Sequence, residues 1–407
     1  MRRYYLGFDW GDEEHTVWVV DETGEKVMRM EVKQTYEGLS EFGGWLNEQV
    51  AVGIEIWAAI EKPEGRIVEF LLDHGVVVYP INPKALDRAR DRFRVCGSKS
   101  DDFDAWVLAE FLRTDHAHLH ALKPSSDQAQ ELKMLVRDYN RMVKEQTRLI
   151  NQLKNTLKEY YPLFLEVFED VTEHAALDFL QAYPCAEALE ALTQKRWQQF
   201  VQVHRIRKNR SVQLWEGFQK PMLPMPAHVV RAKSRLVSVL VEQLRLVVKA
   251  VNTYKTEVNR FFSDCPAAEM ARSLPGGQSG IIIPSIWAEL GDAPGRWKSF
   301  RHLQAQGGSV PYTKQSGKSK SIHFRFGCNK RLRYAAYWLA FTSLRTSEWA
   351  KAYYDAQRVR GHTHRQALRA LGAKWLKIIF VMWRDHVPYD ENYHLANMTR
   401  HQLRQGK

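Results

Sequence analysis

The chain has 407 residues, of which 44% are hydrophobic, and its net charge is +12 at pH 7. This length suggests two or three domains, and the hydrophobic content argues against wholesale disorder. No stretch of 18 apolar residues occurs and the four cysteines are far apart, so we expect no membrane span, no zinc finger and no disulfide framework, as in a protein of a reducing cytosol.

The first 115 residues alternate between strand and helix patterns. Runs at 4–10, 15–21 and 26–32 predict a three-stranded meander. The elements expected next are a helix at 36–49, a buried strand at 56–61, a helix at 65–75, a strand at 76–82, and helices near 83–93 and 101–114. The order βββαβαβα is that of an α/β ribonuclease H-like fold, although many α/β folds share such patterns.

Two long helices with heptad-like spacing follow. In the first, at 128–160, apolar residues recur at alternating steps of three and four, with polar steps at Gln146 and Thr156. The second, at about 229–262, repeats the pattern. The two helices form either a coiled-coil arm that pairs protomers or an antiparallel hairpin within one chain, and the sequence leaves both open. Between them, 174–226 predicts short helices and Pro-rich connections.

From residue 266 onward the pattern changes again. LPGGQSG (274–280) precedes an apolar helix, and a basic stretch rich in Gly and Ser spans 307–321. Helices at about 329–347 and 364–384 complete a mainly α domain. The predicted segments are a catalytic domain at 1–118, a helical coiled-coil segment with an insertion at 119–265, a C-terminal domain at 266–390 and a basic tail at 391–407.

The charge divides unevenly between the two halves of the chain. Residues 1–115 hold 14 Lys and Arg against 23 Asp and Glu, whereas the remaining residues hold 45 against 24. Between Ala293 and Ser347 there are 11 basic residues and no acidic one. A solvated basic surface normally intersperses carboxylates, so this run favours a polyanionic partner, with nucleic acid expected and a plain basic surface as the alternative.

Four carboxylates are placed to meet at one end of the predicted sheet. Asp9 lies inside the first strand between two aromatic residues, where a carboxylate is costly unless a cation offsets it. Glu61 ends the fourth strand, and Asp101 and Asp104 share one helix face while Asp102 points elsewhere. The first and fourth strands are adjacent in a ribonuclease H-like sheet, so the four acids would converge and need cations. Oxygen ligands of this kind select Mg²⁺ or Mn²⁺, and two such ions can assist phosphoryl transfer.

Some of these acids also have a simpler interpretation. Asp101 could be an ordinary acid of a first helical turn, and Glu61 could be a surface residue of the turn EKPEG. Asp9 is the hardest to explain without a cation. Less favoured candidates for the same site are Asp12, Glu55 and Glu64.

Several runs carry a family resemblance in the right order. They are GFDWGDEEHTV, AAIEKPEG, VYPINPKALDRARDRF and GSKSDDFDAWVLAEFLRTD in the first half, and LPGGQSGIIIPSIWAELGD and GSVPYTKQSGKSKSIHFRFGCNKRLRYAAYWLAF in the second. They resemble motifs of the DEDD transposases of bacterial insertion sequences, relatives of the Piv-type DNA invertases that are also called bridge-RNA-guided recombinases. The fourth run is similar to the family motif K-x-D-x-x-D-A, which puts the last two acids at Asp101 and Asp104. The last run is similar to P-x-x-x-x-S-G, which puts the serine nucleophile at Ser316. Gln278 departs from the family's L-P-G-x-G pattern.

The resemblance implies a RuvC-like N-terminal domain, a coiled-coil segment and a C-terminal transposase domain. It also implies dimers that assemble into a tetrameric synaptic complex. A structured guide RNA, the bridge RNA, would pair with donor and target DNA, and cleavage would join a DNA 5′-phosphate to the serine.

Ser316 lies in the basic run TKQSGKSK. A serine hydroxyl is a weak nucleophile that needs activation, and Gly317 beside it permits close backbone approach. Taken without the resemblance, the run favours a flexible basic loop that grips a phosphate; with it, Ser316 is the expected nucleophile. Weaker candidates are Ser319 and Ser321. The residues expected to contact nucleic acid are Lys314, Lys318, Lys320, Arg325, Lys330, Arg331 and Arg333.

The sequence therefore predicts an RNA-guided site-specific DNA recombinase, the transposase of an insertion sequence, which acts through a phosphoserine intermediate with Mg²⁺ held by four acids. The alternative is a metal-dependent endonuclease resembling a Holliday-junction resolvase, which would use the same acids and no covalent step. Ser316 separates the two hypotheses, because a hydrolase has no use for it. A non-enzymatic nucleic-acid scaffold would gain nothing from a carboxylate inside a strand.

Overall fold

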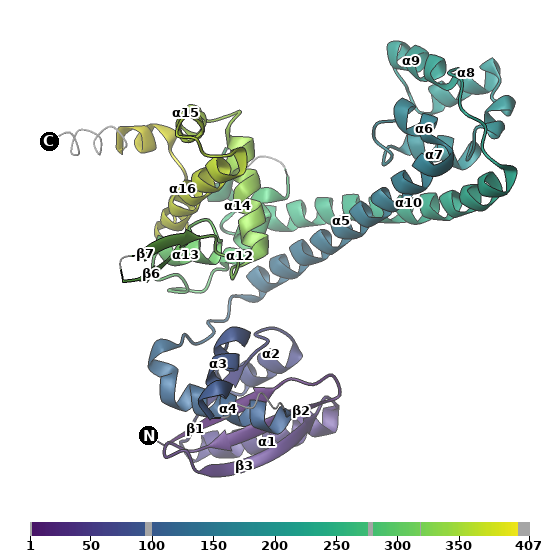
Figure 1. The fold of residues 1–407 in the computed structure, drawn as a ribbon. Helices are drawn as coiled ribbons and strands as arrows, with labels where there is room; N and C mark the ends of the chain where they lie inside the picture. The colour runs from purple at the N-terminus through teal and green to yellow at the C-terminus, as the bar shows by residue number, and fades with distance from the viewer. Residues whose placement is uncertain (1, 94–99, 276–279, 318, 398–407) are drawn as a thin grey trace. The chain divides into compact units, whose positions relative to one another are not determined.

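Five strands near the N-terminus form one sheet in the order β3-β2-β1-β4-β5 (Figure 1). The computed structural model describes residues 2–93, 100–275, 280–317 and 319–397, so Gln278 and Lys318 lie outside it. The chain divides into two compact units, 1–124 and 125–407. The strands are β1 Arg3–Asp9, β2 Glu14–Val20, β3 Lys26–Lys33, β4 Glu55–Ile60 and β5 Val77–Pro80. β1 to β3 form the predicted antiparallel meander, β4 and β5 add in parallel, and the predicted adjacency of the first and fourth strands is confirmed.

Helices cover both faces of this sheet. They are α1 Tyr36–Ala51, α2 Arg66–Asp73, α3 Pro83–Phe93 and α4 Asp101–Asp115, with a short 3₁₀ turn at His116–His118. Phe8 of β1 packs with α1 and α2, whereas Tyr5 packs with α3 and α4. Side chains alternate along a strand, so Tyr5, Gly7 and Asp9 point to the same face, and Asp9 is directed toward the side that α4 covers.

α4 lies against β1 at Gly7. A Cβ atom added to Gly7 would stand 1.7 Å from the carbonyl oxygen of Ala105 and 2.5 Å from the amide nitrogen of Ala109, both in the backbone of α4. No side chain fits there. The missing Cβ lets the helix approach the strand that carries Asp9, and so brings the first turn of α4 toward the end of β1.

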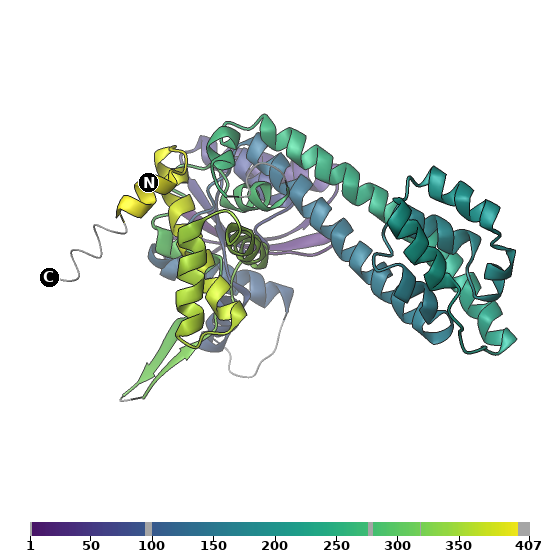
Figure 2. The ribbon, with the colours of Figure 1, turned by 90° about the horizontal axis from the view of Figure 1, so that it is seen from above.

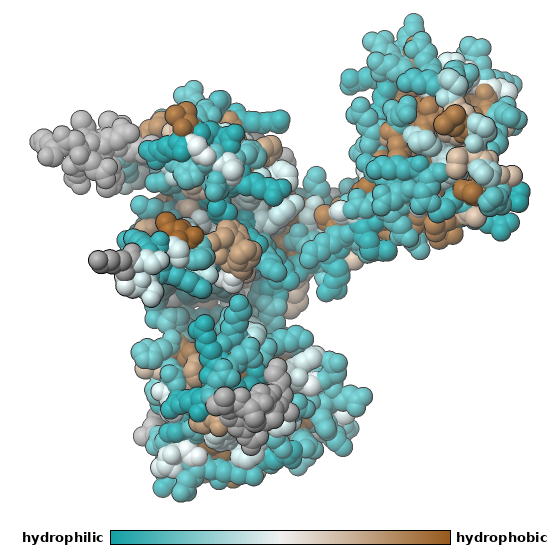
Figure 3. Space-filling model, in the orientation of Figure 1, coloured by the Kyte–Doolittle hydropathy of each residue, from teal (hydrophilic) through white to brown (hydrophobic). Residues whose placement is uncertain are grey.

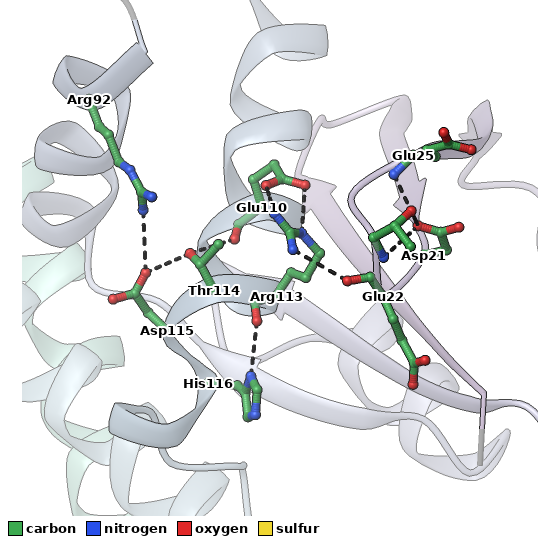
Figure 4. Close-up of polar contacts among 10 residues, drawn as sticks. Asp21, Glu22, Glu25, Arg92, Glu110, Arg113, Thr114, Asp115 and His116 are labelled. Carbon is green, nitrogen blue, oxygen red and sulfur yellow. Dashed lines mark hydrogen bonds and ion pairs between the residues drawn. The ribbon is translucent and has the colours of Figure 1, made fainter.

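A contact network at the other end of α4 holds the helix in place (Figure 4). Arg113 donates to both carboxylate oxygens of the buried Glu110, at 3.0 and 2.7 Å, and to the backbone carbonyl of Glu22 at 3.4 Å. Arg92 of α3 pairs with Asp115 at 3.8 Å. These contacts connect the C-terminal end of α4 to the β2–β3 turn and to α3. The N-terminal turn of α4, which carries Asp101 and Asp104, takes no part in them.

We expect Gly7→Ala to destabilise the first unit strongly. Backbone atoms of α4 block the new methyl group, so the helix must move, at a cost of about 3 kcal/mol or more in the free energy of unfolding. Gly44→Ala is the matched control, because its Cβ on α1 would meet nothing within 4 Å. That change should stabilise the helix by roughly 0.5–1 kcal/mol. Denaturant unfolding measures both, and equal effects of the two substitutions would contradict the contact.

In the second unit, two long helices lie side by side over most of their length (Figures 1 and 2). They are α5 Asp127–Tyr160 and α10 Ala227–Ser263. Near the start of α5, Leu132 shares a buried cluster with Phe262 at the end of α10. Toward the end of α5, Leu153 shares another with Leu240 near the start of α10. The helices therefore run antiparallel and pack on each other within one chain, which is the second of the two alternatives that the heptad pattern left open.

Short helices connect the far ends of the two arm helices. They are α6 Pro162–Val167, α7 His174–Ala182, α8 Gln194–Val203 and α9 Lys208–Phe218, with a 3₁₀ segment at Glu187–Ala191. Their core is aromatic, with Tyr160, Phe164, Phe179, Trp197 and Phe218 buried in it. On the face that Figure 3 shows, hydrophilic residues cover most of the arm, and apolar residues are visible among the short helices at its tip.

The remaining helices pack around the near end of the arm. They are α11 Ala268–Arg272, α12 Ile282–Leu290, α13 Phe300–Gln306, α14 Lys330–Ser343, α15 Glu348–Val359 and α16 His364–Asp385. Leu132 and Phe262 of the arm share one core with Trp287, Leu332 and Trp375 of these helices. No break in the core accompanies the boundary predicted at residue 265, and the division of this unit into two domains stays a prediction.

A β-hairpin interrupts these helices where a flexible loop was the simplest expectation. Its strands are β6 Tyr312–Ser316 and β7 Ser319–His323, and Figure 2 shows them projecting from the helices of this unit. Ser316 pairs with Ser319 at the hairpin turn, where Gly317 has φ +54°. Such turns favour glycine, so TKQSGKSKS can form a hairpin although it lacks an apolar alternation. Among the described residues, no helix has both the length and the apolar character needed to cross a bilayer.

Candidate active site

Asp9 is the last residue of β1, half-buried on the face that α4 covers. The pKa of its carboxyl group is raised from the usual 3.8 to about 6, first by burial and then by the negative charges of Asp101, Asp104 and Glu61, against a lowering by Arg90. The other three predicted acids are therefore close enough to Asp9 to repel its charge. The metal site that the four acids would form stays a prediction.

The fold explains why these acids come together. β1 and β4 are parallel, and the register pairs Phe8 with Ile60, so Asp9 and Glu61 follow at the same edge of the sheet. Lys62 lies 3.7 Å from the centre of the Trp10 ring, a cation–π contact that joins the two chain segments leaving that edge. The Ser100 side chain accepts the backbone N–H of Phe103 and caps α4, so the helix begins at Asp101.

Asp104 has a cationic partner that the sequence interpretation missed. Arg90 of α3 donates through Nε and Nη2 to the two oxygens of Asp104, at 2.5 and 2.7 Å, and through Nη1 to Asp87 at 2.5 Å. Asp104 is almost fully buried, so this bidentate pair supplies the charge compensation that burial requires. Among the described residues, no three His, Cys, Asp or Glu side chains stand close enough together to hold a metal ion as they are arranged here.

Two other acids near the same elements have structural partners. Asp102 accepts a hydrogen bond from Trp18 Nε1 at 3.3 Å and one from Arg29 Nε at 2.6 Å, so it points away from Asp9 as predicted. Glu55 begins β4 and pairs with Arg3 at 2.6 Å, at the opposite end of the strand from Glu61. Glu55 is thereby excluded from the group around Asp9.

The raised pKa of Asp9 predicts a stability effect with a defined sign. The folded metal-free protein binds the Asp9 proton more tightly than the unfolded chain does, so this stabilisation is present below pH 4 and is lost as the pH rises through about 6. In the wild type this loss should lower the free energy of unfolding at pH 7.5, relative to pH 4, by up to ~2 kcal/mol once solvent screening is allowed for. Asp9→Asn should remove this loss. Urea unfolding in the presence of a chelator measures it. Parallel pH profiles of the variant and the wild type would show that the Asp9 carboxylate is not destabilised by its surroundings.

Ser316 lies in the second unit, exposed at the end of β6. Lys314 is two residues away and on the same face of the hairpin as Ser316. Lys320 pairs with Gln315, so its side chain leaves from the opposite face, and of the described lysines in the hairpin only Lys314 shares a face with the serine. The sequence interpretation missed His323 on the Ser316 face, where its Nε2 lies 2.8 Å from Ser321 Oγ.

The other predicted nucleic-acid contacts differ in their surroundings. Lys330 and Arg333 of α14 line a cavity, whereas Arg331 between them is exposed and lies outside it. The Arg325 guanidinium lies 5.9 Å from the centre of the Tyr312 ring in the hairpin. Some basic residues of this unit are therefore exposed on the surface, whereas others line a cavity. The composition of the sequence does not distinguish the two groups.

Comparisons with known families and proteins agree with these features. Residues 6–162 match the family model for DEDD transposases of the IS110 type, and residues 268–355 match the one described as "Transposase IS116/IS110/IS902 family". A Streptomyces coelicolor protein named as a candidate mini-circle transposase for IS117 is 30% identical over 405 residues, 97% of each chain. A 42 kDa protein of insertion element IS900 from Mycobacterium paratuberculosis is 24% identical over 393 residues, 95% of this chain and 96% of its own. The chain therefore belongs to the IS110 family of insertion-sequence transposases, enzymes that cleave and rejoin DNA.

Proposed function

We propose that the chain is an RNA-guided recombinase that breaks and rejoins DNA strands through a phosphoserine intermediate. Its first unit would be a RuvC-like catalytic domain. The observation that carries this proposal is the surroundings of Asp9, where burial and then three further carboxylates raise the pKa of its carboxyl group. An arrangement that repels its own charges is unfavourable in the apo protein and favourable for binding a cation.

The DEDD family implies a divalent metal, and the donor set fits one. Asp9, Glu61, Asp101 and Asp104 offer only carboxylate oxygens, the ligands that Mg²⁺ and Mn²⁺ prefer. The bidentate pair with Arg90 supports this, because the nearly buried Asp104 already takes a cationic partner. Bound Mg²⁺ would supply an electrophile for the attacking and leaving oxygens of phosphoryl transfer. The protein's own contribution is to hold the four acids on two strand ends and one helix turn.

In the proposed step, Ser316 Oγ attacks the phosphorus of one phosphodiester. The new Oγ–P bond joins the DNA 5′-phosphate to the protein, and the bond to the 3′ oxygen of the neighbouring nucleotide breaks, leaving a 3′-hydroxyl. The 3′-hydroxyl of another strand reverses the step and releases the serine. An exposed hydroxyl at a hairpin tip, with Lys314 on the same face, suits approach to a phosphate.

Donor and target DNA and a structured guide RNA are the proposed partners of the basic second half of the chain. The acid-free run from Ala293 to Ser347 supports binding of polyanions, without distinguishing DNA from RNA. A dimer, with a tetramer in the synaptic complex, is the proposed assembly. The first unit holds the acids and the second holds the serine, so each site could combine residues of different protomers.

Covalent trapping tests this proposal. The protein is incubated with donor and target DNA, Mg²⁺ and the RNA transcribed beside its gene, and the products are separated under denaturing conditions. We expect a protein–DNA adduct that depends on the RNA, is absent in Ser316→Ala and persists in the control Ser319→Ala. Cleavage without an adduct would favour the resolvase-like endonuclease, and an adduct formed equally without RNA would contradict guidance.

A further inference from the structure

A cavity of about 410 Å³ opens between α14, α16 and the segment that joins the hairpin to α14. Its volume falls in the range of small-molecule pockets, roughly 300–1,000 Å³. Three of the lining residues, Gly307, Ala336 and Gly372, have small side chains or none, which leaves room for the cavity. A Cβ atom added to Gly372 would stand 3.2 Å from the carbonyl oxygen of Ala336. α14 and α16 therefore approach closely at the floor.

The walls of the cavity are basic and contain no carboxylate. Lys330 and Arg333 come from α14, and Arg365 and Arg369 come from α16, one helical turn apart on the same face. Not one of the described residues that line the cavity is acidic. Four cationic side chains thus line the cavity, and no carboxylate among its described lining residues balances their charge. Arg90 in the first unit differs, because it pairs with two carboxylates.

Two of these arginines are held in place by one aromatic ring. The guanidinium carbons of Arg333 and Arg369 lie 5.2 and 4.8 Å from the centre of the Phe324 ring. Nη1 of Arg333 is buried with no hydrogen-bond partner in the protein, which is costly for a charged donor. The pKa of Arg369 is lowered, chiefly by burial and then by the charge of Arg333. An anion in the cavity would satisfy the free donor and relieve the repulsion.

Aromatic side chains complete the lining. Tyr337 is half-buried and packs at the edge of the unit's core, whereas Tyr334 is 61% exposed at the mouth beside the exposed Lys330. Flat aromatic rings offer stacking surfaces to a nucleobase, and paired guanidinium groups offer bidentate donors to a phosphate. A double helix is far too wide for a cavity of this size, so the lining fits one nucleotide rather than a duplex.

We propose that this cavity binds a single unstacked nucleotide of a nucleic-acid strand, with its phosphate against Arg333 and Arg369 and its base against Tyr337 and Tyr334. Recombination requires strands to separate and exchange, and a site for a displaced nucleotide would keep it from stacking back into the helix. The inference rests on the proposed function in one respect, namely that the second unit contacts nucleic-acid strands while they are being exchanged. Of the lining residues, Arg365, Arg369 and Gly372 lie outside the matched residues 268–355, and the others lie inside them.

The test measures binding by the full-length protein in a chelator, so that no cleavage occurs. The probes are a fluorescent single strand, the same strand with abasic positions, a duplex of the same sequence, and the free mononucleotide and inorganic phosphate as competitors. We expect the wild type to prefer the base-bearing strand to the abasic one by roughly tenfold, the usual effect of stacking one base. Comparing the affinities for a DNA and an RNA single strand of the same sequence shows which of the two nucleic acids the cavity prefers.

Three variants separate the cavity from a general basic surface. Arg369→Gln should weaken binding of the single strand and of the mononucleotide by roughly tenfold, and should change the melting temperature little, since the guanidinium that it removes is only half-buried and is repelled by Arg333. Tyr337→Leu should remove the preference for the base-bearing strand. Arg331→Gln, with the same change of charge outside the cavity, should weaken single strand, abasic strand and duplex by one smaller factor.

Some outcomes would overturn the inference. If Arg369→Gln and Arg331→Gln weaken all probes equally, the cavity is only part of a basic surface. If the abasic strand binds as well as the base-bearing one and inorganic phosphate competes as well as the mononucleotide, it is a phosphate site and not a nucleotide site. Failure of the covalent trapping experiment would leave these binding results unchanged, so the two proposals fail separately.

Discussion

Asp9→Asn is expected to reduce Mg²⁺-dependent strand cleavage on the order of 10³-fold or more, because the central ligand of the proposed metal site loses its charge while its size and most of its packing remain. The effect should be large because Asp9 is half-buried and its pKa is raised by burial and by the charges of the other three acids. Strand cleavage is measured on labelled donor DNA with guide RNA at saturating Mg²⁺. Thermal denaturation with and without Mg²⁺ gives a second readout, since the ion should raise the melting temperature of the wild type and not that of the variant.

Asp102→Asn is the matched control. Asp102 is adjacent to Asp101 in the first turn of α4, but its carboxylate contacts Trp18 and Arg29 instead of facing Asp9. Its ion pair is partly exposed, so its loss should cost no more than ~1 kcal/mol of stability and leave the cleavage rate near that of the wild type. Retained activity in Asp9→Asn, or equal losses in the two variants, would contradict the assigned metal site.

Mixing two inactive proteins, Asp9→Asn and Ser316→Ala, is expected to restore cleavage if each site takes its acids from one protomer and its serine from another. In an equal mixture of dimers half are mixed, and each mixed dimer holds one site with intact acids and an intact serine. About a quarter of the wild-type activity should therefore return. The nucleophile would then meet its activating site only after assembly, so an isolated protomer would not nick DNA.

The mixing experiment depends on exchange of protomers. Mixed dimers are first demonstrated by capturing one variant through a tag and detecting the other. With mixed dimers present, an absence of cleavage would mean that each chain supplies both the acids and the serine of its own site. Activity of Ser316→Ala alone would remove Ser316 from the reaction altogether.

Much of the first unit could be predicted because its signals are local. Alternating apolar residues define the strands, and the position of Asp9 and Glu61 at one edge of the sheet follows once β1 and β4 are adjacent. Arg90 could not be assigned in the same way. Its partner Asp104 is 14 residues away on another helix, and in the sequence it looks like the other arginines of α3. The importance of Gly7 likewise depends on the approach of a backbone that is about 100 residues distant.

The second unit was harder to predict, for two reasons. A heptad pattern states that a helix has one apolar face but does not state what covers that face, and here the partner of α5 is α10 of the same chain. The hairpin around Ser316 is polar and exposed on both faces, so it carries no burial pattern. The nucleotide cavity combines residues from α14 and α16 with Phe324, and only the folded chain shows that they meet.

The antiparallel arm has a consequence for how the chain can change. α5 is 34 residues long, about 50 Å, and the chain that leaves along it returns along α10 to the core it left. Residues added in an exposed connection at the far end leave unchanged the distance between the two arm helices where they enter that core. A fluorescent or affinity module inserted at 219–226, the exposed connection between α9 and α10, should therefore leave the arm and the core at its near end folded.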